Sequence, residues 1–386
     1  MLAANFISVA ARMSLVTFLG IYFVREARID LATVGLAFLC ENLLRGLLAP
    51  LFGALSDRVG RRALLLAASL VTAAVLPSFL LVSGPLTLFA WSVAMGIAGA
   101  VKMPVGSALL LDLAPPERRQ SMLALNYTVV SVAYTLAVSP AGYIAEQGYG
   151  LLAALSTAGY LVVASLYAFG LRGALPMEKG YVERAFYKES IAVLQDRAFL
   201  AFASIALVFP FGMGLVVFAS PLFAADRGLG EGFIGLVLGA NSIIVALLAV
   251  PLANRTEHLG PFRWLGWAAL LVAACFACYA GIPHAGAALV AGTVIFSFGE
   301  LVFSSAVPTA VARLAPAGRR GAYQGGWTLV SSFSMGSALF FSGLLRDAIG
   351  WRGAWLLYAG LALAAGVALL VSRHWLLRRS ERVRDA

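Results

Sequence analysis

The feature that most constrains this chain is a series of long apolar runs separated by short polar loops. Twelve runs are about 20 residues long, the length that a helix needs to cross a ~30 Å hydrocarbon core. Backbone inside a bilayer must satisfy its own hydrogen bonds, and runs of this length fit helices rather than barrel strands. The sequence therefore predicts an all-α membrane protein with twelve transmembrane helices, at about 2–24, 31–55, 63–82, 86–111, 121–145, 151–171, 199–223, 232–253, 264–282, 286–312, 321–345 and 353–372.

The composition supports a chain that lies mostly inside the bilayer. Charged residues make up 12% of the 386 residues and hydrophobic residues 61%, whereas a soluble domain carries about twice that charge. The first run ends in no small-residue cleavage pattern, so we interpret it as a helix and not a signal peptide. The net charge is +10, and we interpret it as the basic residues of loops that flank membrane helices. The expected partner is therefore the lipid bilayer and not nucleic acid.

The placement of Lys and Arg predicts the orientation. With the amino terminus inside, the inner loops and the tail hold 20 of the 28 Lys and Arg residues, and the outer loops hold five. We therefore expect a multi-pass protein of the cytoplasmic (inner) membrane with both termini cytoplasmic.

The longest polar stretch divides the twelve runs into six and six. We predict an N-terminal six-helix bundle at 1–171, an amphipathic linker on the inner face at 172–198, and a C-terminal six-helix bundle with a short cytoplasmic tail at 199–386. The segment that begins at Leu113 returns at Leu314 as a similar Leu-Ala-Pro segment with two arginines, an offset of 201. The two halves are therefore predicted to be pseudo-symmetric parallel repeats.

The loop at 53–62 carries an ordered set of one acid, three arginines and two glycines. We expect Gly53 to allow close backbone approach where the preceding helix ends and Gly60 to form a tight turn. Asp57 is placed to cap a helix start, and Arg61 and Arg62 to face anionic headgroups. An ordinary basic cytoplasmic loop does not need this order.

This loop resembles the one between helices 2 and 3 of the major facilitator superfamily, most closely its drug/metabolite:proton antiporter branch. The matching residues are Gly53, Leu55, Asp57, Arg58, Gly60, Arg61, Arg62 and Leu65. The resemblance implies two six-helix halves that work by alternating access, usually as a monomer. It also implies that Asp57 holds the halves together on the cytoplasmic side in the outward-open state, and that Arg61 reaches toward Asp112 at the end of helix 4.

Five ionisable residues lie well within the predicted spans: Arg12, Glu41, Arg45, Lys102 and Glu300. Each costs at least a few kcal/mol at the bilayer centre, so each is a candidate for function. They fall on helices 1, 2, 4 and 10 and not on helices 3, 6, 9 and 12, which the family fold places toward lipid.

Two interpretations of the charges in the first two helices stay open. Glu41 and Arg45 are four residues apart and can pair on one helix face, either as a structural pair or with a role in substrate or proton binding. Arg12 is either a basic residue of the kind found in helix 1 of drug-exporting facilitators or the partner of Glu41.

A repeat argument links the remaining two charges. The offset of 201 carries Lys102 to position 303, three residues after Glu300. Our hypothesis is that Lys102 and Glu300 face each other across the central cavity and pair, or compete for one proton. The alternative is that Glu300 only bonds to nearby Ser or Thr. Asn126 and Trp327 correspond at the same offset and are expected at the cytoplasmic end of the cavity.

Two departures from the family patterns limit the assignment of coupling. Ser92 stands where helix 4 of proton-coupled members has an arginine. The helix 5 antiporter pattern is reduced to Thr135, Ser139, Pro140 and Gly142. Proton antiport is therefore expected from the fold and not from these motifs.

The predicted function is secondary active transport, with proton-coupled export of small hydrophobic or amphipathic compounds. No nucleotide-binding loop is present, so the energy must come from a gradient. Alternatives are transport of an organic anion or metabolite, because the five buried charges sum to +1, lipid or lysolipid flipping, and a membrane sensor. An enzyme, a cofactor and a metal are not expected, and Cys275 and Cys278 are interpreted as packing residues.

Overall fold

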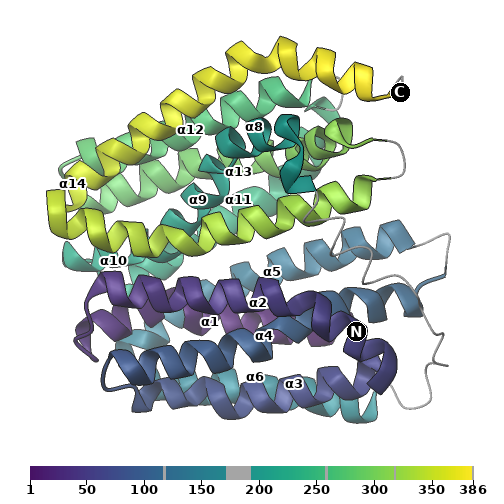
Figure 1. Cartoon of the computed structure of the whole chain (residues 1–386). Helices are drawn as coiled ribbons and strands as arrows, with labels where there is room; N and C mark the ends of the chain where they lie inside the picture. The colour runs from purple at the N-terminus through teal and green to yellow at the C-terminus, as the bar shows by residue number, and fades with distance from the viewer. Residues whose placement is uncertain (116–118, 171–192, 257–259, 317–318, 385–386) are drawn as a thin grey trace. The chain divides into compact units, whose positions relative to one another are not determined.

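The chain is helical in the part that the computed structural model describes. That part is residues 1–386 apart from 116–118, 171–192, 257–259, 317–318 and 385–386 (Figure 1). No strand occurs within these ranges, and eleven helical segments in them are long and apolar enough to cross a membrane. The predicted all-α membrane class is confirmed. The predicted number of twelve helices stays a prediction, because the stretch Ala322–Ser372 counts as one segment.

That stretch lies in α14 (Arg320–Arg384), which contains the last two predicted runs. Its helical geometry is interrupted at Gly350, where φ is 70° and ψ is 168°. A glycine adopts this left-handed φ without the steric cost that a Cβ brings. Figure 1 shows α14 bending sharply, so that its yellow part runs back in the direction opposite to its yellow-green part.

The chain forms two compact units. One consists of Met1–Glu183 with Gly228–Ser242, and the other of Arg184–Arg227 with Ile243–Ala386. Most of the predicted linker at 172–198 lies outside the described residues. The predicted boundaries at 171 and 198 therefore stay predictions.

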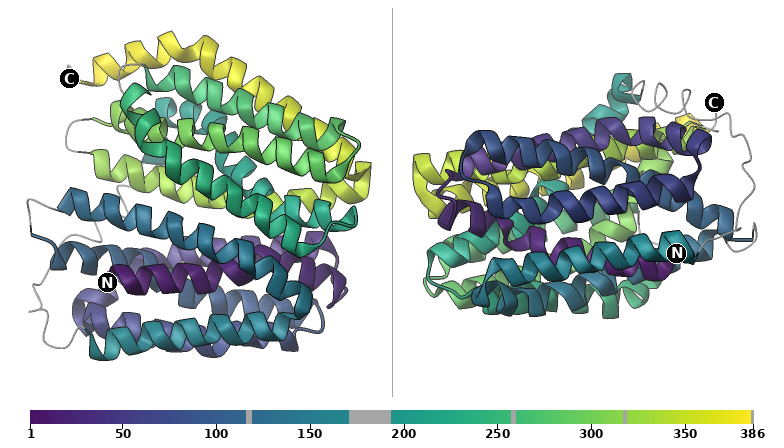
Figure 2. Two further views of the ribbon diagram at one scale, coloured as in Figure 1. Left: turned by 180° about the vertical axis from the view of Figure 1, so that it is seen from behind. Right: turned by 90° about the horizontal axis from the view of Figure 1, so that it is seen from below.

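The first unit is a bundle in which long helices lie side by side (Figures 1 and 2). Helix α2 packs on α4, α1 packs on α5 and α6, and α3 packs on α6. Its core includes Leu65, Val105, Val163 and Tyr167, all almost fully buried. The elements are α1 (Leu2–Arg25), α2 (Leu31–Val59), α3 (Arg61–Val75), η1 (Leu76–Leu81), α4 (Pro85–Leu113), α5 (Arg119–Gln147), α6 (Tyr149–Phe169) and the start of α11 (Glu231–Thr256).

Local sequence explains where α2 begins. The Asp30 side chain accepts a hydrogen bond of 2.8 Å from the Thr33 backbone N–H, which satisfies one of the free donors of the first turn.

The second unit begins with a broken span. Helices α8 (Arg197–Ala206), α9 (Val208–Gly214) and α10 (Ser220–Asp226) follow one another, with a π-helical turn at Leu215–Ala219 between the last two. Together they form one candidate span, Arg197–Asp226. Helix α12 (Pro261–Gly281) packs on α14 and on α13 (Ala285–Leu314).

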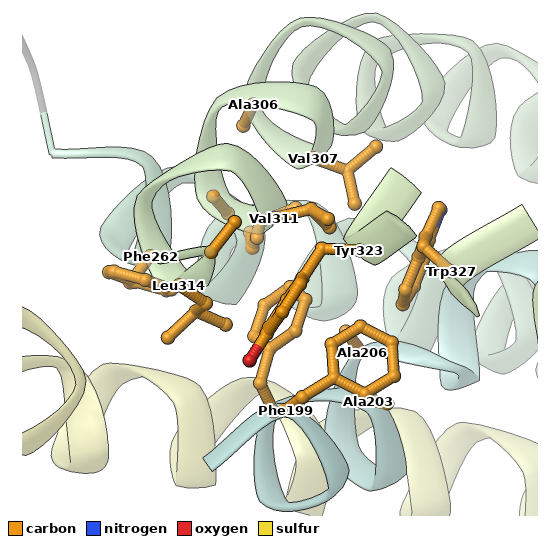
Figure 3. Packing of buried hydrophobic residues seen from close by; sticks show 14 of the residues in the cluster. Phe199, Ala203, Ala206, Phe262, Ala306, Val307, Val311, Leu314, Tyr323 and Trp327 are labelled. Carbon is orange, nitrogen blue, oxygen red and sulfur yellow. The ribbon is translucent and has the colours of Figure 1, made fainter. Parts of the chain in front are cut away.

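Aromatic side chains fill the core of this unit near the start of α14. Figure 3 shows Phe199 against Tyr323, with Phe262 and Trp327 on opposite sides of this pair. The Tyr323 hydroxyl donates to Asp196. The same carboxylate caps α8 by accepting from the Ala198 N–H at 2.8 Å. This contact fixes the start of α8 against α14.

Candidate functional site

Three of the predicted site residues meet inside the first unit. Arg12 of α1 donates to Glu41 Oε1 of α2 at 2.7 Å, and Arg45, one turn further along α2, donates to the same oxygen. The Glu41 side chain is 2% exposed, against 13% for Arg12 and 27% for Arg45. Glu41 therefore pairs both with Arg45 of its own helix and with Arg12 of α1. The role of the cluster, structural or in substrate or proton binding, stays a prediction.

Two glycines of α4 let α2 come close enough to build this cluster. A Cβ placed on Gly96 would lie 2.9 Å from the backbone oxygen of Glu41, and one on Gly99 would lie 2.7 Å from Arg45 Nε. The missing side chains leave room for the α2 backbone and for the guanidinium group. Arg45 Nε is fully buried and has no hydrogen-bond partner among the described residues.

Lys102 adds a third positive charge to the cluster. It lies on α4, one turn beyond Gly99, and is half-buried. The charges that act on it are those of Arg12 and Arg45, both repulsive, and the described residues offer it no hydrogen bond or ion pair. Tyr160 of α6 also lies within reach of Arg12, Arg45 and Glu41. Two guanidinium groups therefore share one carboxylate. With Lys102 charged beside them, the group has a net charge of +2.

Glu300 lies in the second unit, half-buried on α13. It has an interaction within the described residues. The hypothesis that it faces Lys102 stays a prediction.

The pair Asn126 and Trp327 occupies two different environments. Asn126 of α5 accepts a hydrogen bond of 2.6 Å from the Asn5 side chain of α1. Trp327 is 7% exposed and packs in the aromatic core of the second unit with Phe202 and Phe303 (Figure 3). Their predicted place at the end of a cavity stays a prediction.

The loop at 53–62 differs in part from its expected structure. Helix α2 does not end near Gly53 but continues to Val59, so Asp57 lies in its last turn and does not cap a helix start. Gly60, with φ of 96°, makes the turn and is also the N-cap residue of α3. Polar residues can form helical backbone hydrogen bonds too, so α2 continues beyond the end of the apolar run. The Asp57 side chain lies outside the described part, and Arg58 is exposed.

The next two arginines of the loop bind neighbouring helices. Arg61 forms an ion pair with Asp112 at the end of α4, as the resemblance implied. Arg62 donates to the backbone oxygens of Tyr167 at 2.7 Å and Ala168 at 2.6 Å, and its place near headgroups stays a prediction. These carbonyls are at the C-terminus of α6, where a cation also meets the negative end of the helix dipole.

Sequence reasoning missed a second polar cluster in the first unit. The Tyr149 hydroxyl of α6 donates to Glu231 Oε1 at 2.9 Å, and Glu146 of α5 accepts from the Gly232 N–H at 2.9 Å. Both contacts hold the first turn of α11. The sequence carries one signal for this cluster, which is an acid next to a Gly in the first turn of a helix. The free N–H groups of a first helical turn attract carboxylates.

No group of three or more His, Cys, Asp or Glu residues that could hold a metal ion occurs in the described ranges. Cys275 and Cys278 are free thiols on α12, one buried and one partly buried.

The comparisons identify the family. The profile of the Major Facilitator Superfamily matches residues 1–230 and 202–385. The chain belongs to the Major Facilitator Superfamily. Its relatives include "Multidrug resistance protein MdtH" of Cronobacter sakazakii, 24% identical over 86% of this chain and 79% of the relative. Another is the "Na(+), Li(+), K(+)/H(+) antiporter" of Planococcus maritimus, 26% identical over 79% of each chain.

Solved structures agree on the fold of this superfamily member. The nucleoside transporter NupG matches with a TM-score of 0.80 over 96% of this chain and 97% of that chain, at 14% identity. The relatives and fold neighbours are membrane transporters. The protein is thus a multi-pass transporter of the Major Facilitator Superfamily type.

Proposed function

We propose that this protein exports small hydrophobic or amphipathic compounds in exchange for protons, by alternating access across the cytoplasmic membrane. The relatives named for multidrug resistance and for cation/proton antiport support both parts of this proposal. Both termini are placed on the cytoplasmic side because the predicted inner loops hold most Lys and Arg residues.

The choice of the proton-carrying residue depends on the ion pairs of Glu41. Glu41 and Glu300 are the two acids well within the predicted spans. Glu41 is held by two guanidinium groups and is almost fully buried, so it serves to compensate Arg12 and Arg45. We therefore assign the carrier role to Glu300, with Lys102 as the cation that pairs or competes with it for the proton.

Substrate-triggered proton movement in proteoliposomes with a trapped pH dye tests this proposal. The substrate panel contains lipophilic cations, organic acids and lysolipids. In the wild type one class moves protons, and in Glu300→Gln the movement is lost. Asp347→Asn is the matched control, because Asp347 is a carboxylate whose side chain is 54% exposed. It leaves proton movement unchanged.

Two results would contradict the proposal. Unchanged proton movement in Glu300→Gln would remove Glu300 as the carrier. Substrate binding without transport in the wild type would favour a sensor over an exporter.

A further inference from the structure

The cluster around Glu41 has more positive charge than its own structure needs. Glu41 pairs with Arg12 and Arg45, and Lys102 lies within electrostatic reach of both arginines without pairing with the carboxylate. Even with a neutral Lys102 the group keeps one net positive charge. Uncompensated charge in a span costs several kcal/mol, so a retained excess needs a reason beyond packing.

The second half of the chain indicates that folding is not this reason. At the repeat offset of 201, Arg12, Glu41 and Lys102 correspond to Met213, Ser242 and Phe303. Phe303 stacks on Phe209 with ring centroids 3.9 Å apart. A helix pair of the same type is therefore built without any of these charges.

Unused hydrogen-bond donors lie in the same place. The Lys102 ammonium has no hydrogen bond or ion pair to any described residue, and Arg45 Nε is buried without a partner. Arg45 nevertheless keeps 27% of its side chain exposed. Donors that lack acceptors, in a region of net positive charge, are the complement of a carboxylate or sulfonate.

The position along the helices fits a ligand in transit. Arg12 lies about 15 Å from the start of α1 at 1.5 Å per residue, close to the middle of the span Leu2–Arg25. The spans that carry these residues are otherwise apolar.

We propose that Arg45 and Lys102, supported by Arg12, form a binding site for the negatively charged group of a small amphipathic organic anion. This inference rests on the proposed transport function and names the substrate class. It excludes lipophilic cations as the preferred substrates, because the cluster repels them.

Calorimetric titration of the purified full chain in a non-ionic detergent at low salt tests the inference. The probes are 2-naphthalenesulfonate, 2-naphthylmethanol and 2-naphthylmethylammonium, which share one ring system and differ in charge. The sulfonate binds the wild type about tenfold or more tightly than the alcohol, which is the size of one charge-assisted hydrogen bond. The ammonium probe binds most weakly.

The variants separate a binding role from a structural one. Lys102→Gln weakens sulfonate binding about tenfold, leaves the alcohol unchanged and raises Tm, because it removes a repulsive charge. Arg45→Gln also weakens the sulfonate, and Lys102→Arg retains it. Arg352→Gln, which removes one exposed cation elsewhere, changes nothing.

Three results would overturn the inference: ammonium binding as tight as sulfonate binding, sulfonate binding that is unchanged in both Lys102→Gln and Arg45→Gln, or no sulfonate binding to the folded wild type up to about 10 mM. The titration needs no gradient. Sulfonate binding without proton movement would therefore support this inference and contradict proton-coupled export. Proton movement driven only by cations would support proton-coupled export and contradict this inference.

Discussion

Arg12 of α1 and Glu41 of α2 form an ion pair of 2.7 Å in the middle of two membrane spans. The pair joins two helices at a depth where each charge alone is costly. Glu41 is the more deeply buried partner, and Arg45 uses the same oxygen. The stability of the first unit therefore depends on one carboxylate.

Replacing this carboxylate is expected to be strongly destabilising. Glu41→Gln leaves Arg12 and Arg45 without their counter-charge, and loss of one partner of a buried pair costs about 3–5 kcal/mol. Unfolding in detergent, followed by tryptophan fluorescence, measures the change. The double variant Arg12→Gln/Glu41→Gln is expected to lose less than the sum of the single variants. A loss in Glu41→Gln as small as that in Asp347→Asn would contradict this assignment.

The glycines of α4 give a graded prediction. Gly96→Ala places a methyl group against the Glu41 backbone oxygen, which cannot move alone, whereas Gly99→Ala meets the flexible Arg45 guanidinium. We expect Gly96→Ala to lower stability by about 1–3 kcal/mol and Gly99→Ala to cost less.

Thermal unfolding of both variants, with Gly84→Ala as the control, checks this order. A Cβ on Gly84 has nothing within 4 Å. Equal losses in all three variants would show that α2 and α4 are not in close contact.

The Arg61–Asp112 pair is expected to contribute little to stability. The two side chains are 23% and 35% exposed, and exposed pairs typically contribute about 0–1 kcal/mol. A double-mutant cycle of Arg61→Gln and Asp112→Asn measures the coupling free energy. A transport rate that falls in either variant while the stability stays constant would assign the pair to conformational exchange. A coupling energy above about 2 kcal/mol would instead make it a structural pair.

The start of α11 is expected to loosen when Glu146 is replaced. Glu146→Gln weakens the acceptor for the Gly232 N–H, and a lost hydrogen bond of about 1 kcal/mol corresponds to roughly fivefold faster amide exchange. Hydrogen-exchange mass spectrometry of the peptide around Gly232 measures it, with the start of α13 as an internal reference. Tyr149→Phe is expected to act in the same direction. Unchanged exchange in both variants would contradict a role of these contacts in holding α11.

Much of the fold could be predicted because each span carries its own signal in length and hydropathy. The pairing of Glu41 with Arg45 also follows from their spacing on one helix. The second partner could not be assigned, because spacing within α2 says nothing about which face of α1 presents Arg12. Gly96 and Gly99 set the approach of α4 to α2, and this too could not be predicted, because a glycine in an apolar run has many ordinary explanations.

The errors concern helix ends. The apolar run stops near residue 55, but backbone hydrogen bonding continues to Val59, which moves Asp57 from a loop into a helix. The backbone partners of Arg62 were missed because every residue has a carbonyl group, so the sequence does not show which one accepts a hydrogen bond.

The contact between Tyr149 and Glu231 was missed because the two residues are far apart in the sequence.

The two arginines that follow Gly60 attach α3 in two different ways. Arg61 binds a side chain that can change its rotamer or move with α4, whereas Arg62 binds main-chain oxygens that stay as long as α6 is a helix. One contact is therefore reversible and the other permanent. Breaking the first removes one contact between α3 and the end of α4, whereas the start of α3 stays anchored on α6. The turn at Gly60 can therefore lose this link to α4 without having to refold.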